Sequence, residues 1–131
     1  MTQTLVIHGT LPGLNQLLDA KQYRGPVRSR TGKRWNGYAN MKRQWGDAIY
    51  WQAVKELKPM KAAHLHYIWI EKDRQRDPDN ITAGGRKIIL DALIRAGILP
   101  DDSMKYILSQ SDVWEVDPAR AGVIVRLEDE R

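Results

Sequence analysis

The sequence predicts a single α+β domain in which a small mixed β-sheet packs against two main helices. Apolar residues recur at intervals of three and four in two segments, which is the period of an amphipathic helix, and short β-rich runs flank both segments. The 131 residues, 42% of them hydrophobic, are enough for one core, and no repeat or shift in composition divides the chain. We therefore expect one compact domain over residues 1–131.

The first half of the chain is expected to contribute a strand, a long loop, a helix and a second strand. A short run at Thr4–His8, ended by Gly9 and Pro12, predicts the first strand. Residues 20–38 contain several glycines and a proline without a helical period, which predicts a basic loop or arm. Helical spacing of apolar residues starts near Asn40 and ends before Pro59. Leu65–Ile70 then predicts a strand with both faces at least partly covered.

A second helix is expected after the charged segment that follows this strand. Its buried stripe is Ile88, Ile89, Ala92, Leu93 and Ala96. Asn80 is a candidate N-cap and Gly97 a candidate C′ residue, because asparagine accepts from free N–H groups and glycine tolerates the left-handed conformation. Gly84 and Gly85 each cost about 1 kcal/mol against alanine inside a helix. Either the helix begins near Arg86, or another group approaches the backbone closely at these glycines.

Two further strands are predicted at Tyr106–Trp114 and Ala121–Leu127. A turn between them opens at Asp117 and Pro118. The order strand, arm, helix, strand, helix, strand, strand favours a mixed sheet covered by the two helices.

Basic residues are unevenly distributed along the chain. The net charge is +5 and the sequence pI is about 9.6, which attracts polyanions in general. Eight basic residues and no acidic residue fall between Lys21 and Arg43. Contacts to phosphate position a protein on DNA but read little sequence. We expect such contacts from Arg28, Arg30, Lys33 and Arg34 in the arm, and from Arg74 and Arg76 beside the carboxylates described next. The alternative is that the arm is only a solvated loop.

Several classes of protein are disfavoured by what the sequence lacks. It contains no cysteine, which excludes disulfides and thiolate metal sites. No apolar run approaches the ~20 residues that cross a bilayer, so no membrane partner is expected. Residues 1–4 lack the features of a secretory signal, and we expect a cytoplasmic protein.

The most informative stretch holds five carboxylates and one lysine within 26 residues: Asp77, Asp79, Lys87, Asp91, Asp101 and Asp102. Mg²⁺ takes oxygen ligands, and one or two carboxylates completed by water and substrate phosphate are its usual site. Two aspartates separated by one residue can face one ion where Pro78 bends the chain. The structural alternative is that the aspartates and Asn80 are turn and cap residues, and that Lys87 and Asp91 form a surface ion pair worth roughly 0.3 kcal/mol. Gathered in a basic chain, the carboxylates favour a metal-dependent nuclease.

The order and spacing of these residues resemble one family. The sequence is similar to the RusA-type Holliday junction resolvases at three motifs in order: Asp77-x-Asp79-Asn80, Lys87-x-x-x-Asp91-Ala92-Leu93, and Gly97-x-x-x-Asp101-Asp102. These are small homodimeric, Mg²⁺-dependent endonucleases of phage and prophage origin that cut four-way DNA junctions. The likeness covers residues 70–112. It implies branched DNA as substrate, a homodimer, and Mg²⁺ as cofactor with Mn²⁺ as a substitute, in a bacterial or phage-infected cell.

Carried over by position, the resemblance implies metal-binding carboxylates at Asp77, Asp79 and Asp102, with Asp91 at a further acidic position. It also implies a catalytic lysine at Lys87. In the family this lysine lies closer to the Asp-x-Asp-Asn motif, whereas here residues 81–86 intervene, like a four-residue insertion. Arg86 is therefore an alternative to Lys87 as the basic group of the site.

The implied mechanism is metal-assisted hydrolysis of a phosphodiester. One or two Mg²⁺ ions held by the carboxylates would lower the pKa of a bound water, align it with the scissile phosphate and stabilise the leaving oxygen. Lys87 would stabilise charge on the phosphate or orient the water. A symmetric dimer suits paired cuts in two strands related by two-fold symmetry.

Two other functions stay open. One is a catalytically inactive protein that binds branched DNA. The other is a nucleotide-sugar transferase with an Asp-x-Asp metal site, although the chain is short for one and its basic arm would be unexplained. Metal-dependent cleavage separates the nuclease from the inactive binder, and preference for branched DNA separates both from the transferase.

Overall fold

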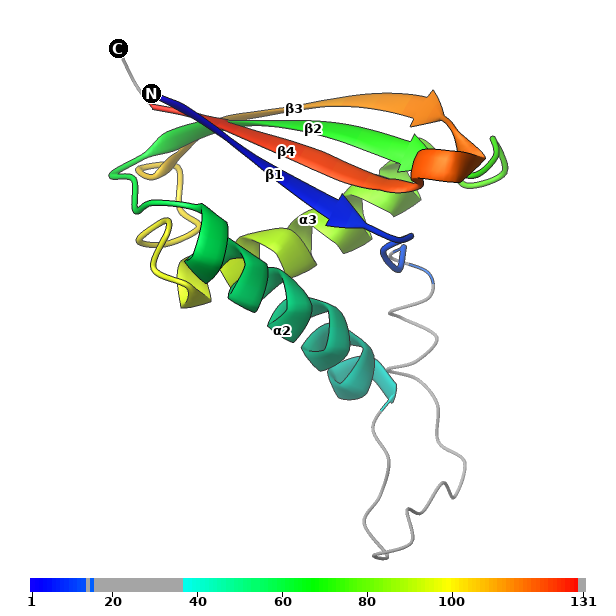
Figure 1. Cartoon of the computed structure of the whole chain (residues 1–131), viewed down its shortest axis with the longest axis horizontal. Helices are drawn as coiled ribbons and strands as arrows, with labels where there is room; N and C mark the ends of the chain where they lie inside the picture. The colour runs from blue at the N-terminus through cyan, green and yellow to red at the C-terminus, as the bar shows by residue number, and fades with distance from the viewer. Residues whose placement is uncertain (14, 16–36, 130–131) are drawn as a thin grey trace, which may run out of the picture.

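Four strands form one mixed sheet in the order β1, β4, β2, β3 (Figure 1). The computed structural model describes residues 1–13, 15 and 37–129. The strands are β1 (Thr2–His8), β2 (Ala63–Glu71), β3 (Ile107–Val116) and β4 (Gly122–Glu128). β4 is antiparallel to both β1 and β2, whereas β3 is parallel to β2.

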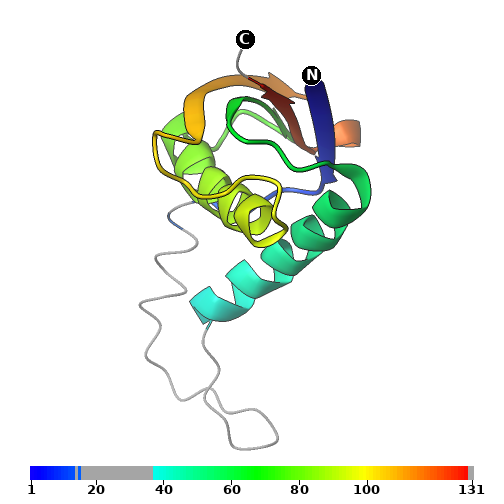
Figure 2. The same cartoon turned by 90° about the vertical axis from the view of Figure 1, so that its left-hand side faces the viewer.

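Two long helices, α2 (Gly37–Glu56) and α3 (Pro78–Arg95), lie on the same face of this sheet (Figures 1 and 2). α3 lies beneath β2 and β3, and α2 lies nearer β1 (Figure 2). The predicted α+β class, with a mixed sheet and two helices, is therefore confirmed. Within the described ranges, neither helix combines the length and the apolar character of a bilayer span.

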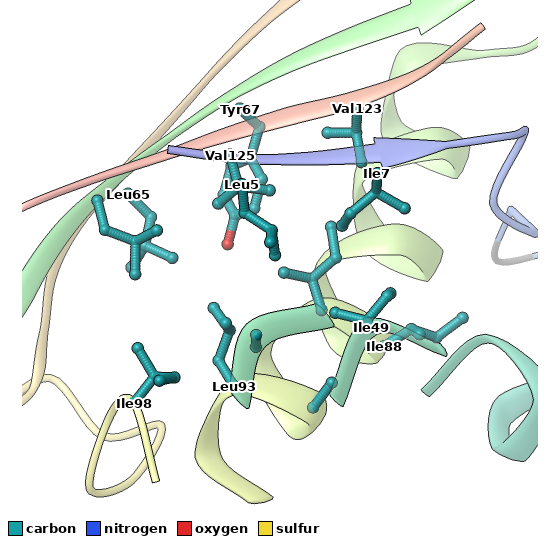
Figure 3. Close-up of a cluster of buried hydrophobic side chains, with 14 of the residues drawn as sticks. Leu5, Ile7, Ile49, Leu65, Tyr67, Ile88, Leu93, Ile98, Val123 and Val125 are labelled. Carbon is teal, nitrogen blue, oxygen red and sulfur yellow. The ribbon is translucent and has the colours of Figure 1, made fainter. Parts of the chain in front are cut away.

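The core fills the space between the sheet and the helices (Figure 3). Alternate residues of the strands point into it, and the apolar stripes of the helices meet them. Its fully buried side chains include Leu5, Leu65, Tyr67, Val123 and Val125 from the sheet, and Ile49, Ile88, Ile89 and Leu93 from the helices. Burial of each such side chain contributes about 1.5–3 kcal/mol, and this anchors the elements that carry the candidate site.

α3 begins at Pro78, so the alternative start near Arg86 is wrong. Its N-cap is Asp77 rather than Asn80, because the Asp77 side chain accepts a hydrogen bond from the N–H of Asp79. Proline suits the first helical position, where its missing N–H needs no partner.

A close approach explains Gly85 inside α3. A Cβ at Gly85 would lie 2.5 Å from Cζ3 of Trp69, so the indole of β2 packs directly on the helix backbone there. The second of the two sequence-based alternatives is therefore confirmed: the helix continues, and glycine is required for its packing.

α3 ends as the sequence predicts. Gly97 has φ +75°, its N–H donates to the carbonyl of Ile94, and the N–H of Ile98 donates to the carbonyl of Leu93. These two bonds form a Schellman motif, which confirms Gly97 as the C′ residue.

The connection from β3 to β4 passes across the end of β2. A 3-10 turn, η1 (Pro118–Arg120), links the two strands, which are not neighbours because β2 and β4 pair with each other. The N–H of Asp117 donates to the carbonyl of Glu71 at 2.9 Å and ties the turn to β2.

Candidate functional site

Asp77 and Asp79 lie at the N-terminal end of α3, after the turn that leaves β2. Asp77 is extended (φ −67°, ψ 131°), as a residue before proline prefers, and its Oδ1 accepts from the Asp79 N–H at 2.8 Å. Both residues are exposed, and within the described chain no basic side chain forms an ion pair with either. Negative charge here stabilises the helix end. The second oxygen of Asp77 and the carboxylate of Asp79 are still available to a cation.

Arg76 lies beneath this corner instead of facing solvent. Its Nε and Nη2 donate to the two oxygens of Glu71 at 2.7 and 3.0 Å, and its Nη1 donates to the carbonyl of Leu11 at 2.9 Å. All three nitrogens of the guanidinium are thus used to tie the end of β2 to the segment after β1. Of the two arginines expected to contact DNA here, only Arg74 is exposed.

Asn80 holds the segment that leads into the basic arm. Its Oδ1 accepts from the backbone N–H of Asn15 at 2.7 Å, in place of the capping role expected. A Cβ at Gly13 would lie 2.5 Å from Asn80 Nδ2, so this segment packs closely against the start of α3. The basic stretch begins six residues after Asn15, at Lys21. The arm residues expected to bind DNA lie outside the described residues: Arg28, Arg30, Lys33 and Arg34.

Arg86 and Lys87 have different surroundings. Arg86 donates through Nε and Nη2 to the carboxylate of Asp112 on β3, and its guanidinium lies 5.4 Å from the centroid of the Tyr67 ring. The indole N–H of Trp69 donates to the same carboxylate at 2.8 Å. Arg86 therefore neutralises an aspartate that is only 11% exposed, whereas Lys87 is exposed. Of these two residues, Lys87 is therefore the one whose charge faces solvent, whereas the charge of Arg86 is used within the fold.

Asp112 belongs to a polar network between α3 and the sheet that the sequence does not single out. The Tyr67 hydroxyl donates to Gln110 Oε1 at 2.7 Å, and burial raises the pKa of Tyr67 well above its usual range, which keeps this donor protonated. One feature of the sequence could have pointed to Asp112: it is an acidic residue inside a predicted strand, and a carboxylate needs a partner when it is buried. Only the fold identifies that partner as Arg86.

Asp91 faces α2 and not the other carboxylates. Its Oδ2 lies 3.2 Å from Nζ of Lys42, in a groove of about 500 Å³ between α2 and α3. Asp91 lies twelve positions after Asp79 on the same helix, a distance of about 18 Å along the helix axis. The structure thus does not bring Asp91 into a metal site with Asp77 and Asp79.

Asp101 and Asp102 follow the opposite end of α3 (Figure 1). The 18 residues of the helix span about 27 Å. Because β3 is parallel to β2, the chain must return along the sheet before β3 can begin, and this return carries Asp102 away from Asp77. Across the ranges that the structure describes, no three His, Cys, Asp or Glu side chains form a group able to hold a metal. Within one chain, the expected metal set is therefore split between two ends of one helix.

A cleft of about 610 Å³ adjoins the Asp77 and Asp79 corner. It lies between the turn after β2 and the end of β3, and its walls are both charged and apolar: Glu71, Asp73, Arg74, Arg76, Pro78, Ile81, Trp114, Glu115 and Val116. Trp114 is 45% exposed, so the cleft has an uncovered indole in a wall that also contains Glu71, Asp73 and Glu115.

Comparison with known proteins leaves the function to be argued from this geometry. No protein-family model matches the chain, and a search of curated proteins finds no significant match.

Proposed function

We propose that the protein is a Mg²⁺-dependent endonuclease that cuts branched DNA, with the four-way junction as its substrate, and that it acts as a homodimer. The observation that carries this proposal is the exposed pair Asp77 and Asp79, next to the segment that leads into the basic arm. Carboxylates without basic partners and a run of phosphate-binding side chains are the two parts that a metal nuclease needs.

The corner offers the kind of ligand that a divalent cation takes. Oxygens of Asp77 and Asp79 would hold Mg²⁺, whose remaining positions suit water and substrate phosphate. The bound ion supplies Lewis acidity and a water of lowered pKa. Lys87 lies about two turns along α3 from Asp79, about 12 Å along the axis, and its long side chain would contact the substrate strand beside the cut.

A third carboxylate must come from a second chain. Asp102 follows the far end of α3, so one chain cannot bring it to the corner. Two copies related by a two-fold axis, with their α3 helices antiparallel, would place Asp102 of each beside Asp77 and Asp79 of the other. Such a dimer has two equivalent sites, as paired cuts in two symmetric strands require.

The basic side chains account for affinity and not for sequence preference. Arg28, Arg30, Lys33, Arg34 and Arg74 would contact phosphates, with binding that weakens steeply as salt is raised. Recognition of the shape of a junction needs no reading of base edges.

The proposal is tested by mixing two inactive variants, Asp79→Asn and Asp102→Asn, under conditions that exchange subunits. In each mixed dimer, one site carries both substitutions and the other keeps every carboxylate. Mg²⁺-dependent nicking of a labelled four-way junction is therefore expected to return. Each variant alone is expected to bind the junction without cutting it, and EDTA and a linear duplex serve as controls.

Other outcomes of this assay discriminate between the functions. If the wild type cuts the junction but the mixture of the two variants binds it without nicking, the site is not shared between chains. A wild-type protein that binds junctions tightly but cuts under no divalent metal is an inactive binder. Absence of any preference for branched DNA removes the DNA-based proposal altogether.

A further inference from the structure

The edge of the sheet at β3 exposes a large share of the apolar side chains. Of the eight large hydrophobic residues exposed in the described chain, four belong to β3 and the loop before it: Met104 (91%), Val113 (41%), Trp114 (45%) and Val116 (46%). β3 is the last strand of the sheet in the described part of the chain, so its outer backbone groups have no strand to pair with there. Its ten residues include no proline and no lysine, the residues that usually protect an edge from pairing.

The opposite edge of the sheet differs. β1 is shorter, with seven residues, and the side chain of Gln52 on α2 donates to the carbonyl of Val6. Val6 is the one large apolar residue of β1 that is exposed. The two edges are thus not equivalent, and β3 is the edge that is less protected from pairing with another strand.

We propose that β3 pairs antiparallel with β3 of a second copy of this chain, joining the two sheets across a two-fold axis near the middle of the strand. This inference rests on the proposed function for the need of a partner, and it names the surface through which that partner binds.

Symmetry fixes the antiparallel direction. Two copies of one edge strand that pair across a two-fold axis run antiparallel, and the contact is the same on both copies. This pairing brings Lys105, which precedes β3 in one copy, toward Glu115 and Asp117 at the other end of β3 in its partner.

This pairing also has consequences for the carboxylates. Because α3 lies beneath β2 and β3, the two α3 helices would run side by side and antiparallel (Figure 2). The loop with Asp102 and the exposed Met104 of one copy then approaches the cleft of about 610 Å³ on the other, whose wall includes Trp114. Met104 would cover an apolar wall that a single chain leaves open.

The first test is the mass of the whole chain in solution, by light scattering and sedimentation. The wild type is expected at twice the 15.1 kDa of one chain. Val113→Lys is expected at the mass of one chain, because the two-fold axis would bring the lysines of the two copies close to each other, and like charges on paired strands repel. Val6→Lys is the matched control, since Val6 is 40% exposed on the other edge, and it is expected to stay dimeric. A monomeric wild type, or a dimeric Val113→Lys, overturns the inference.

A second test avoids any variant that weakens the fold. The chain has no cysteine, so a single introduced thiol can form a disulfide only between copies. In an antiparallel pair a residue near the axis lies opposite its own copy, at a Cβ spacing close to that of a disulfide. One of Ser109→Cys, Ser111→Cys and Val113→Cys is expected to cross-link on mild oxidation, and Thr4→Cys on β1 is not. Failure of all three to cross-link contradicts the pairing.

These readouts do not depend on cleavage. A dimer joined through β3 that never cuts DNA removes the proposed function and leaves the interface. An active nuclease that stays dimeric as Val113→Lys removes the interface and leaves the function.

Discussion

The two ends of α3 carry parts of the same carboxylate motif, but they are held in different ways. At the N-terminal end, side chains from distant segments lock together: Arg76 binds Glu71 and the carbonyl of Leu11, and Asn80 binds Asn15. At the C-terminal end, consecutive backbone groups around Gly97 close the helix on themselves.

This difference shows which half of the motif depends on the whole fold. The surroundings of Asp77 and Asp79 exist only when β1, β2 and α3 are assembled. The turn that leads to Asp101 and Asp102 is a local structure that a few residues specify. If both ends serve one site, substitutions of the carboxylates at the two ends should be alike in activity. Substitutions of the residues that support each end should differ in their cost in stability.

The largest effect is expected from removing a carboxylate at either end. Asp77→Asn and Asp102→Asn should each lower the rate of junction cleavage about a thousandfold, because a lost metal ligand removes several kcal/mol of transition-state stabilisation. The free energy of unfolding should hardly change, since asparagine caps a helix about as well as aspartate. Single-turnover cleavage and urea unfolding measure the two quantities.

Asp101→Asn is the matched control for this prediction. Its Oδ1 accepts from the N–H of Asp102 at 2.8 Å, a local turn contact that asparagine can keep, so cleavage should continue. Normal cleavage in the Asp102 variant would show that the two ends do not belong to one site. Loss of cleavage in the Asp101 variant would show that the effect at this end is not specific to Asp102.

A smaller effect, on stability, is expected from removing cations at different points of α3. Arg86→Met leaves Asp112 buried without its partner and should lower the free energy of unfolding by about 3 kcal/mol. Arg95→Met, in the last turn, removes an exposed pair with Asp47 and should cost less than about 1 kcal/mol. Urea denaturation of both variants measures the difference, and equal losses would mean that the buried network does not support the N-terminal half.

The smallest effects are expected at two glycines, with opposite signs. Gly97→Ala places a side chain at φ +75° and should destabilise the fold by about 1 kcal/mol. Gly46→Ala lies inside α2, where a Cβ meets nothing within 4 Å, and should stabilise it by up to about 1 kcal/mol. Thermal unfolding checks both. A Gly97 variant as stable as the wild type would show that the C-terminal end does not depend on this motif.

The elements of this fold were predictable from the sequence because their causes are local. Several local patterns each act over a few residues: the apolar run in β1, the alternation in β2, the three- and four-residue spacing in both helices, and Gly97 after the last apolar turn. The exposed carboxylate pair beside Pro78 was predictable for the same reason. The start of α3 was not, because Gly85 disfavours a helix locally and only the packing of Trp69 explains it.

What the tertiary structure decided is which charged residues are available and which are used to build the fold. Spacing alone treats Arg74 and Arg76 alike and leaves Arg86 and Lys87 as alternatives. Only the partners Glu71 and Asp112 separate the members of each pair. The separation of Asp102 from Asp77 was likewise hidden, because it follows from β3 being parallel to β2. Strand direction is set by contacts between residues far apart in the chain, and a local sequence pattern does not indicate these contacts.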